Sequence, residues 1–422
     1  MPAGHRVSRT SLAVAAFSTV VEWYDFTLYL YFSTVLARVF FGGGEGALVT
    51  ALMGFALAYL MRPVGAAAFG HIGDRYGRRP MLLISMAIMS LAMLGTALLP
   101  TYGQVGIAAA WLLFALRCVM GFSVGGEYTG VIAYLLEGAD PRRRGLVASL
   151  AAASSEIGAL LAVGVSALTV SLTSEDQLAS WGWRVPFFVG AALAGGVWFA
   201  RQSMEESPEW AALHKADALH ANPLGHAVTR QKAALLRAFA ISALGSITYY
   251  VGISYVPAFL DTTGTLGEER VLWLSTAAAV AVILVTPLVG LLSDRFGRKP
   301  ALVVIALLSA VLPISLFTLM AGGTASEALG GALVLALVAG GMSAIGAIAC
   351  GEQFGEASRA SGLGLGYTLA TALFGGLTPW LAQLLVERTG APQVPGIMIA
   401  MVAVAALPVF LTMRETAPGR LR

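Results

Sequence analysis

Long apolar stretches follow one another along almost the whole chain, and most of them carry few charged residues. Of the 422 residues, 57% are hydrophobic and 12% are charged, which is about half the charged share of an ordinary soluble domain. Since ~20 helical residues cross the hydrocarbon core of a bilayer, stretches of this length are candidate membrane spans. The sequence therefore predicts an all-α membrane protein with twelve spans. The expected spans cover residues 11–36, 47–69, 81–100, 106–136, 145–172, 184–202, 233–260, 270–291, 301–321, 327–350, 360–387 and 394–413.

The stretch 203–232 interrupts this pattern with three glutamates, three histidines and two prolines. We expect it to be a cytoplasmic linker between an N-terminal bundle of six helices, 1–202, and a C-terminal bundle of six helices, 233–422. It is too short to hold a separate soluble domain.

The basic residues indicate which side of the membrane each loop faces. Of the 26 Lys and Arg residues, all but six lie at the two termini or in loops on the same side of the expected spans. Four of the six lie on the opposite side, and Arg62 and Arg117 lie inside spans. Because cytoplasmic loops carry an excess of Lys and Arg, this distribution predicts that both termini are cytoplasmic.

One short basic, glycine-rich segment occurs twice, between the second and third spans and between the eighth and ninth. The first copy reads GHIGDRYGRRP at 70–80, and the second reads GLLSDRFGRKP at 290–300. Self-similarity at a fixed offset of about half the chain is typical of an internal repeat. The two bundles are therefore expected to be related by pseudo-symmetry.

The repeated segment resembles the signature loop of the major facilitator superfamily. Other motifs resemble its metabolite:proton symporter subfamily, which includes transporters of proline and betaine, 2-oxoglutarate, shikimate and citrate. These motifs are Glu22–Phe26, Met61–Gly65, Gly121–Glu127, Trp183–Phe187 and Phe374–Pro379. The resemblance implies a protein of the bacterial inner membrane that moves two bundles around a midplane site by alternating access.

No pattern of an enzyme is present in the sequence. Cys118 and Cys350 lie in apolar stretches without metal-ligand spacing, and there is no nucleotide-binding P-loop or GxSxG elbow. The resemblance and the intramembrane charges favour proton-coupled uptake of a small carboxylate-bearing metabolite, such as an organic acid, by a monomer in the lipid bilayer. We expect no cofactor besides the proton as coupling ion, and no nucleic acid. The alternatives are symport of a zwitterion such as proline or betaine, proton-driven export, and a receptor that binds a metabolite without moving it.

Two carboxylates lie in the first expected span. Glu22 and Asp25 are about one turn apart on one helix face, near the middle of the membrane. Neighbouring carboxylates discourage each other's ionisation, as a proton carrier requires, although both could instead pair with fixed arginines. We place Asp25 ahead of Glu22. The predicted proton-coupling residues are Asp25, Glu22, Glu127 and Glu156.

Arg117 is the first candidate for holding a substrate carboxylate, because a guanidinium binds a carboxylate bidentately and stays charged. The alternative is a buried ion pair with Asp25 or Glu22. An arginine locked to such a carboxylate would remove the preference for an organic acid over a zwitterion. Aromatic side chains can enclose the apolar part of a substrate. The other predicted substrate-binding residues are Tyr29, Tyr250, Tyr367 and Trp380.

Each repeated segment contains an aspartate that can accept hydrogen bonds from the amides of a helix N-terminus, where the helix dipole favours negative charge. We expect its arginines to pair with glutamates at the inner ends of the fourth and tenth spans. Arg62 suits an inner gate or an ion pair with Glu127 or Glu156. The predicted gating residues are Arg62, Asp74, Arg75, Arg78, Glu137, Asp294, Arg295, Arg298 and Glu352.

Overall fold

The computed structural model describes residues 7–43, 47–216, 222–263, 268–355 and 358–417, and every regular element in these ranges is a helix. The elements of the N-terminal half are α1 (Arg9–Phe17), α2 (Thr19–Tyr31), α3 (Ser33–Phe41), α4 (Ala47–Tyr76), α5 (Arg78–Leu98), α6 (Tyr102–Val105), α7 (Ala108–Gly138), η1 (Pro141–Arg143), α8 (Arg144–Leu172), α9 (Glu175–Gln177), η2 (Leu178–Gly182) and α10 (Arg184–Arg201).

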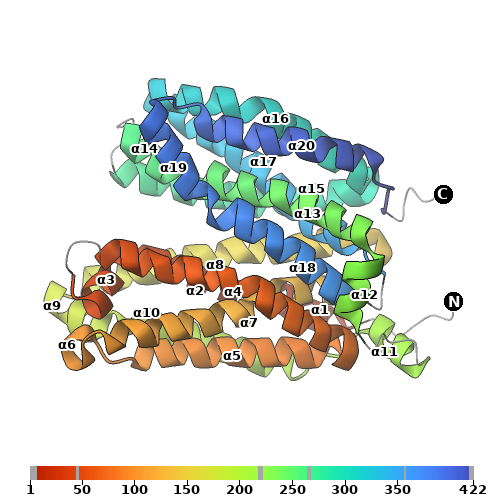
Figure 1. The fold of residues 1–422 in the computed structure, drawn as a ribbon, viewed down its shortest axis with the longest axis horizontal. Helices are drawn as coiled ribbons and strands as arrows, with labels where there is room; N and C mark the ends of the chain where they lie inside the picture. The colour runs from red at the N-terminus through yellow and green to blue at the C-terminus, as the bar shows by residue number, and fades with distance from the viewer. Residues whose placement is uncertain (1–6, 44–46, 217–221, 264–267, 356–357, 418–422) are drawn as a thin grey trace.

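Two short helices, α11 (Pro208–Lys215) and α12 (Pro223–Arg230), lead to the C-terminal half. Its elements are α13 (Lys232–Tyr249), η3 (Tyr250–Ser254), α14 (Val256–Thr263), α15 (Glu268–Phe296), α16 (Arg298–Gly322), α17 (Ala325–Gly351), α18 (Arg359–Thr371), η5 (Ala372–Gly376), α19 (Thr378–Thr389) and α20 (Val394–Thr412). Figure 1 shows the halves as two bundles side by side, with α11 and α12 at one end and α6 and α9 at the other.

Most of the expected spans correspond to single long helices. Within the described residues, ten helical segments are long and apolar enough to cross a membrane. The count becomes eleven if Glu175–Gly182 and Arg184–Arg201, bent by 40°, form one span. Large apolar side chains cover the outside of both bundles, because Leu91, Trp111 and Met401 are each at least 66% exposed. Such a surface is stable only against lipid or another apolar partner.

The first expected span, 11–36, is divided into three helices. Breaks at Ser18 and Phe32 separate α1, α2 and α3, each of which is too short to cross a bilayer alone. Figure 1 shows the three following one another along the bundle, from the end with α11 to the end with α9. At the first break, the Ser18 hydroxyl donates to the Ala15 carbonyl at 2.6 Å. Competition of this kind between a serine and the backbone bends helices.

The seventh and eleventh spans each contain a π-helical turn, η3 and η5. Pro257 and Pro379 follow these turns, and a proline cannot donate the backbone hydrogen bond that would continue a regular helix. At η3 the Tyr255 amide donates to the Tyr250 carbonyl, five residues back. Such turns frequently accompany functional sites.

Glycines bring α7 against α4. A Cβ atom at Gly121 would lie 2.0 Å from the Ala58 carbonyl oxygen, and one at Gly125 would lie 2.1 Å from the Arg62 carbonyl oxygen. No larger residue fits at either position without moving the α4 backbone. This close approach brings Arg62 of α4 and Arg117 of α7 next to α2.

Candidate functional site

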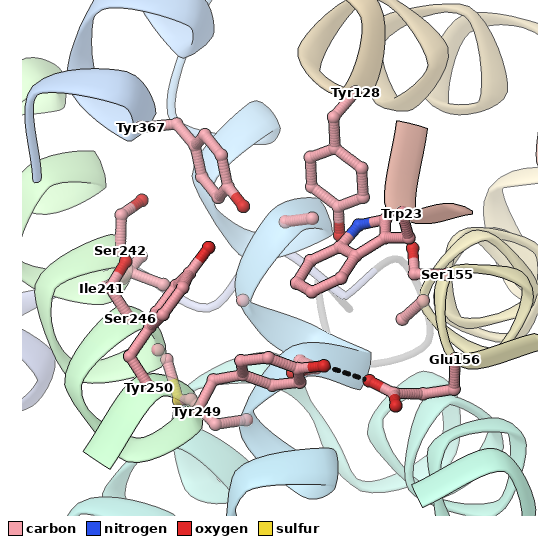
Figure 2. Close-up of a pocket in the computed structure, with 16 residues that line it drawn as sticks. Trp23, Tyr128, Ser155, Glu156, Ile241, Ser242, Ser246, Tyr249, Tyr250 and Tyr367 are labelled. Carbon is pink, nitrogen blue, oxygen red and sulfur yellow. Dashed lines mark hydrogen bonds between the residues drawn. The ribbon is translucent and has the colours of Figure 1, made fainter. Parts of the chain in front are cut away.

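A cavity of ≈70 Å³ lies between the two bundles and takes its walls from both. Figure 2 shows aromatic rings from opposite sides arranged around this common space, with a carboxylate at its edge. Small residues of α13 and α17 complete the wall. The aromatic and acidic lining residues are Trp23, Tyr128 and Glu156 of the N-terminal bundle and Tyr249, Tyr250 and Tyr367 of the C-terminal bundle.

Glu156 of α8 is a buried carboxylate at the wall of this cavity, 4% exposed. Its Oε1 atom accepts a hydrogen bond from the Tyr249 hydroxyl at 2.6 Å, drawn as a dashed line in Figure 2. The Trp23 ring packs edge-on against Tyr249, with the ring centroids 5.1 Å apart. The hydrogen bond therefore joins the two bundles directly at the cavity.

A larger vestibule of ≈600 Å³ adjoins the cavity and shares Trp23, Glu156 and Tyr249 with it. Its walls continue to Arg38 of α3 and Leu178 of η2. Figure 1 places α3 and α9 at the end of the bundles opposite α11 and α12. The cavity is thus approached from the end that does not carry the repeated loops.

Asp25 and Arg117 form a buried, bidentate ion pair. The Arg117 Nη1 atom donates to Asp25 Oδ2 at 2.9 Å, and Nη2 donates to Oδ1 at 3.2 Å. The guanidinium also lies over the Tyr29 ring, 5.0 Å from its centroid. Arg117 was expected either to bind a substrate carboxylate or to form a buried ion pair, and the structure has the ion pair with Asp25. Neither Arg117 nor Asp25 lines the central cavity.

Glu22 is neutralised much less completely. Its Oε1 atom is 3.5 Å from Arg62 Nη2, and its Oε2 atom has no hydrogen-bond partner among the described residues, although Glu22 is only 3% exposed. A small space of ≈20 Å³ separates this pair from Asp25 and Arg117, and the four side chains line it together. Of the alternatives for Arg62, the ion pair with Glu127 or Glu156 is wrong, because its carboxylate partner is Glu22 of α2.

Tyr59 connects Arg62 with the cavity through a cation–π contact and a hydrogen bond. The guanidinium lies 4.4 Å from the centroid of the Tyr59 ring, and the Tyr59 hydroxyl is hydrogen-bonded to the hydroxyl of Tyr250 across the two bundles. Nearby, the rings of Tyr128 and Tyr367 meet across the same boundary, with centroids 5.3 Å apart. These contacts close the cavity on the side of the repeated loops.

Glu127 pairs with Arg201, which lies at the end of the expected span 184–202 and was counted among the basic residues of the adjoining loop. Arg201 is 0% exposed, and its two terminal nitrogens donate to the two Glu127 oxygens. The Ser85 hydroxyl donates to Oε2 at 2.6 Å. Glu127 lines none of the spaces described above, and its role in proton coupling stays a prediction.

The aspartates of the repeated loops each bind a helix of the opposite bundle. The Asp74 oxygens accept from the amides of Ala360 and Ser361 at the start of α18, at 3.1 and 2.9 Å. In the other copy, the Asp294 oxygens accept from Gly145 and Leu146 at the start of α8, at 2.8 and 2.9 Å. The predicted contact with a helix N-terminus is confirmed in both copies, and we call the two arrangements the latches.

One arginine supports each latch. Arg78 bridges Asp74 and Glu137, with 2.6 Å to each. Arg298 lies 2.7 Å from Asp294 and 3.4 Å from Glu352. These predicted pairs are confirmed. The other predicted loop arginines, Arg75 and Arg295, are exposed and lie over the neighbouring rings of Tyr76 and Phe296, outside the buried latches.

A glutamate beyond the last helix of each bundle also binds its own repeated loop. Glu206 accepts from the amides of Arg78 and Arg79 at the start of α5, and Glu415 accepts from the corresponding amides at the start of α16. Burial raises the pKa of Glu206, against the lowering effect of these amides. This pair was not predicted from the sequence, because the Met-x-Glu patterns at 204–206 and 413–415 are 209 residues apart, whereas the two repeated loops are 220 residues apart.

The linker contributes a contact that reaches both bundles. Glu209 of α11 lies 2.9 Å from Arg144 at the start of α8 and 2.6 Å from Arg359 at the start of α18. Burial raises the pKa of Glu209, with the Arg359 guanidinium opposing the shift. The linker thus lies against the latches.

Trp380 does not reach the cavity. Its side chain on α19 is 64% exposed on the apolar surface, so its assignment to substrate binding is wrong. Tyr29 also lies outside the cavity, because its hydroxyl donates to the Ala51 carbonyl at 2.7 Å. Tyr250 and Tyr367 do line the cavity, as expected.

Two helical membrane bundles around a central cavity, latched at one end and open to a vestibule at the other, define a secondary transporter that works by alternating access. The chain belongs to the sugar (and other) transporter family, whose profile matches residues 12–421. It is therefore a multi-pass membrane transporter and not an enzyme, and the resemblance to the major facilitator superfamily is confirmed.

Relatives of similar length support this assignment. The chain is 32% identical to the proline/betaine transporter of Escherichia coli K12 over 98% of this chain and 85% of the relative. It is also 32% identical to the alpha-ketoglutarate permease of E. coli K12, over 96% and 93% of the two chains, and to the shikimate transporter of E. coli K12, over 90% and 88%.

Solved structures share the fold. The proton:xylose symporter XylE bound to 6-bromo-6-deoxy-D-glucose matches with a TM-score of 0.81 at 19% identity over 96% of each chain. The inward open conformation of XylE matches with a TM-score of 0.66 over 96% of each chain.

Proposed function

We propose that this protein is a proton-coupled symporter that takes up a small carboxylate-bearing metabolite across the bacterial inner membrane. Segments 1–202 and 233–422 move as two bundles around the cavity, and 203–232 joins them on the cytoplasmic side, where both termini lie. The positions of Lys and Arg support this orientation, and one relative is named an inner membrane metabolite transport protein. Betaine, proline, alpha-ketoglutarate and shikimate, which occur in the names of relatives, all bear a carboxylate.

The observation that carries the proposal is the buried and incompletely bonded carboxylate of Glu22. A buried carboxylate without full neutralisation favours its protonated form, whereas two strong hydrogen bonds to a guanidinium favour the ionised form. Asp25 has those bonds with Arg117, and Glu22 has only a 3.5 Å contact with Arg62. We therefore place the coupling proton on Glu22 and give Asp25 a structural role.

The link between proton and cargo follows from the neighbours of Glu22. Arg62 lies over Tyr59, whose hydroxyl is bonded to Tyr250 at the cavity wall. When Glu22 is protonated, Arg62 loses its counter-charge and is free to change its contact with Tyr59. Protonation in this way loosens a contact between the two bundles beside the cargo.

Proteoliposomes containing only this protein test the proposal. Cargo is first identified by thermal-shift screening of acids, amino acids and betaines, followed by counterflow. Uptake of that cargo is then measured with and without an inward proton gradient. The wild-type protein should accumulate it only with the gradient, and Glu22→Gln should keep counterflow while losing acceleration by the gradient. Glu175→Gln, an exposed acid on α9, is the matched control and should behave as the wild type.

Three results would count against the proposal. Uptake at the same rate with and without the proton gradient would indicate a facilitator. Accumulation of cargo in the vesicles only when the proton gradient is directed outward would indicate an exporter. Binding without any flux would indicate a receptor. Loss of gradient dependence in Asp25→Asn but not in Glu22→Gln would show that Asp25, and not Glu22, carries the coupling proton.

A further inference from the structure

We propose that the cargo carries a positively charged nitrogen, such as a quaternary or secondary ammonium, and that Glu156 is its counter-charge in the cavity. This inference rests on transport through that cavity and narrows the cargo from carboxylate-bearing metabolites in general to zwitterions. Glu156 then faces the cargo, while Glu22 carries the proton.

The charges around the cavity support a cation. Among the described residues that line it, Glu156 is the only charged side chain. The two intramembrane arginines that favoured an organic acid are engaged elsewhere, Arg117 with Asp25 and Arg62 with Glu22. A cargo with only negative charge would meet a buried carboxylate and no arginine or lysine, and such like-charge contacts in a desolvated site are costly.

The aromatic rings support the same conclusion. The faces of tryptophan and tyrosine attract cations, and cages of such rings are a known means of recognising quaternary ammonium groups. Trp23, Tyr128 and Tyr367 meet Tyr249 and Tyr250 around the space shown in Figure 2. A carboxylate beside these rings adds a full counter-charge in a water-poor space, where electrostatic attraction is stronger than in water.

Size and access are compatible with this cargo. The cavity of ≈70 Å³ excludes a sugar polymer or a drug-sized molecule, and a small metabolite has room where the cavity meets the ≈600 Å³ vestibule. Trp23, Glu156 and Tyr249 line both the vestibule and the cavity, so an ammonium that passes from one space into the other meets them. Since the Glu156–Tyr249 hydrogen bond joins the two bundles, a bound cation also competes with a contact that holds them together.

Two pairs of isosteres test the charge alone. Glycine betaine and 3,3-dimethylbutanoate share shape and carboxylate but differ by a nitrogen cation in place of a carbon, as do L-proline and cyclopentanecarboxylate. Binding is measured by calorimetry on the purified full-length protein without any gradient. In at least one pair, the nitrogen compound should bind roughly tenfold or more tightly than its carbon isostere. Equal binding within both pairs, binding only of anions such as 2-oxoglutarate, or no binding of either nitrogen compound overturns the inference.

Variants assign the recognition to residues. Glu156→Gln should lower the affinity for the nitrogen compound by about tenfold or more and should raise the affinity for the anionic carbon isostere, because it removes a like charge from the cavity wall. Tyr249→Phe, which keeps the ring, should bind better than Tyr249→Leu. Trp23→Leu provides a second readout if Glu156→Gln fails to fold. Unchanged selectivity in both Glu156→Gln and Trp23→Leu overturns the assignment.

The two proposals fail separately. Selectivity between isosteres is measured without a proton gradient, so it does not depend on proton coupling. Conversely, gradient-driven uptake of a simple organic acid would refute the cationic cargo and leave the symporter intact.

Discussion

The buried charges of the N-terminal bundle differ in how fully their partners neutralise them. Asp25 and Arg117 share two hydrogen bonds, Glu127 and Arg201 share two more, and Glu22 keeps one oxygen without a partner among the described residues. A charge left alone after loss of its partner is strongly unfavourable in such surroundings. Replacing one member of such a pair should therefore lower the stability of the protein, whereas replacing both members should restore much of it.

We expect Asp25→Asn to lower the stability of the purified protein by about 3–5 kcal/mol, because Arg117 would remain charged and buried. Asp25→Asn combined with Arg117→Gln should recover much of that loss. Thermal unfolding in detergent measures both. A double variant no more stable than Asp25→Asn would contradict the structural role of the pair.

A second prediction concerns Gly77, at the turn of the first repeated loop. Gly77 has φ +113°, and a Cβ there would lie 2.3 Å from the Glu206 Oε2 atom. We expect Gly77→Ala to cost at least about 1–3 kcal/mol, since a side chain is strained at this φ and displaces the carboxylate from the α5 amides. Thermal unfolding checks this. Gly330→Ala, in helix α17 with open space around it, is the control and should be neutral or slightly stabilising.

Single residues were predictable where local chemistry decides their contacts. The aspartates of the repeated loops could be assigned to helix N-termini because a short acidic side chain beside free amides has few better partners. Glu156 and Tyr249 are 93 residues apart in the sequence, and their contact depends on how the two bundles pack against each other. No local sequence pattern carries that information. Arg201 was misplaced because a basic residue at the end of an apolar stretch is ordinarily a loop residue.

At the scale of elements, the latches join α4 to α18 and α15 to α8 by the same geometry. Each uses a carboxylate to bind two backbone amides of the opposite bundle, and hydrogen bonds to a charged acceptor contribute about 1.5–3 kcal/mol each. Similar contacts on both sides of the pseudo-symmetry axis hold together the end of the bundles that carries the repeated loops. Weakening either latch should favour inward opening.

We expect Asp74→Asn to increase the inward open population by tenfold or more, because a free energy of about 1.4 kcal/mol already corresponds to that factor. Pulsed EPR between spin labels at positions 142 and 296, in a background without Cys118 and Cys350, should show a longer distance component. Asp294→Asn should act in the same direction. An unchanged distance distribution in both variants would refute the gating role of the latches.

Element boundaries were predictable to the extent that apolar length decides them. Most spans lie where the hydropathy places them, whereas the breaks at Ser18 and Phe32 leave the apolar pattern uninterrupted. The π-turns before Pro257 and Pro379 were not predicted, since a proline in an apolar stretch shows that a regular helix is interrupted but not what form the interruption takes.

At the scale of the whole molecule, the open vestibule and closed latches predict one-sided access. On α8, Val163 lines the vestibule and Val147 lies in a groove near η1 at the other end. An impermeant thiol reagent added outside intact cells should modify Val163→Cys and spare Val147→Cys. In inside-out vesicles the order should reverse, and the same order in both preparations would refute the proposed orientation.

The two-bundle architecture was the most predictable feature, because repeated loops and apolar length both report it directly. The conformation was not predictable, since the same contacts within each bundle suit every state of the transport cycle. The substrate preference also depended on structure, because it turns on whether the arginines of α4 and α7 are already paired.

The helices held by the latches are the ones that carry cavity residues. Starting from the amides bound by Asp294, α8 reaches Glu156 ten residues later, about 15 Å along its axis. From those bound by Asp74, α18 reaches Tyr367 six residues later, about 9 Å. A continuous helix behaves as a stiff rod over such lengths. We therefore expect a cargo that displaces α8 or α18 at the cavity to displace the bonded amides at the latch as well.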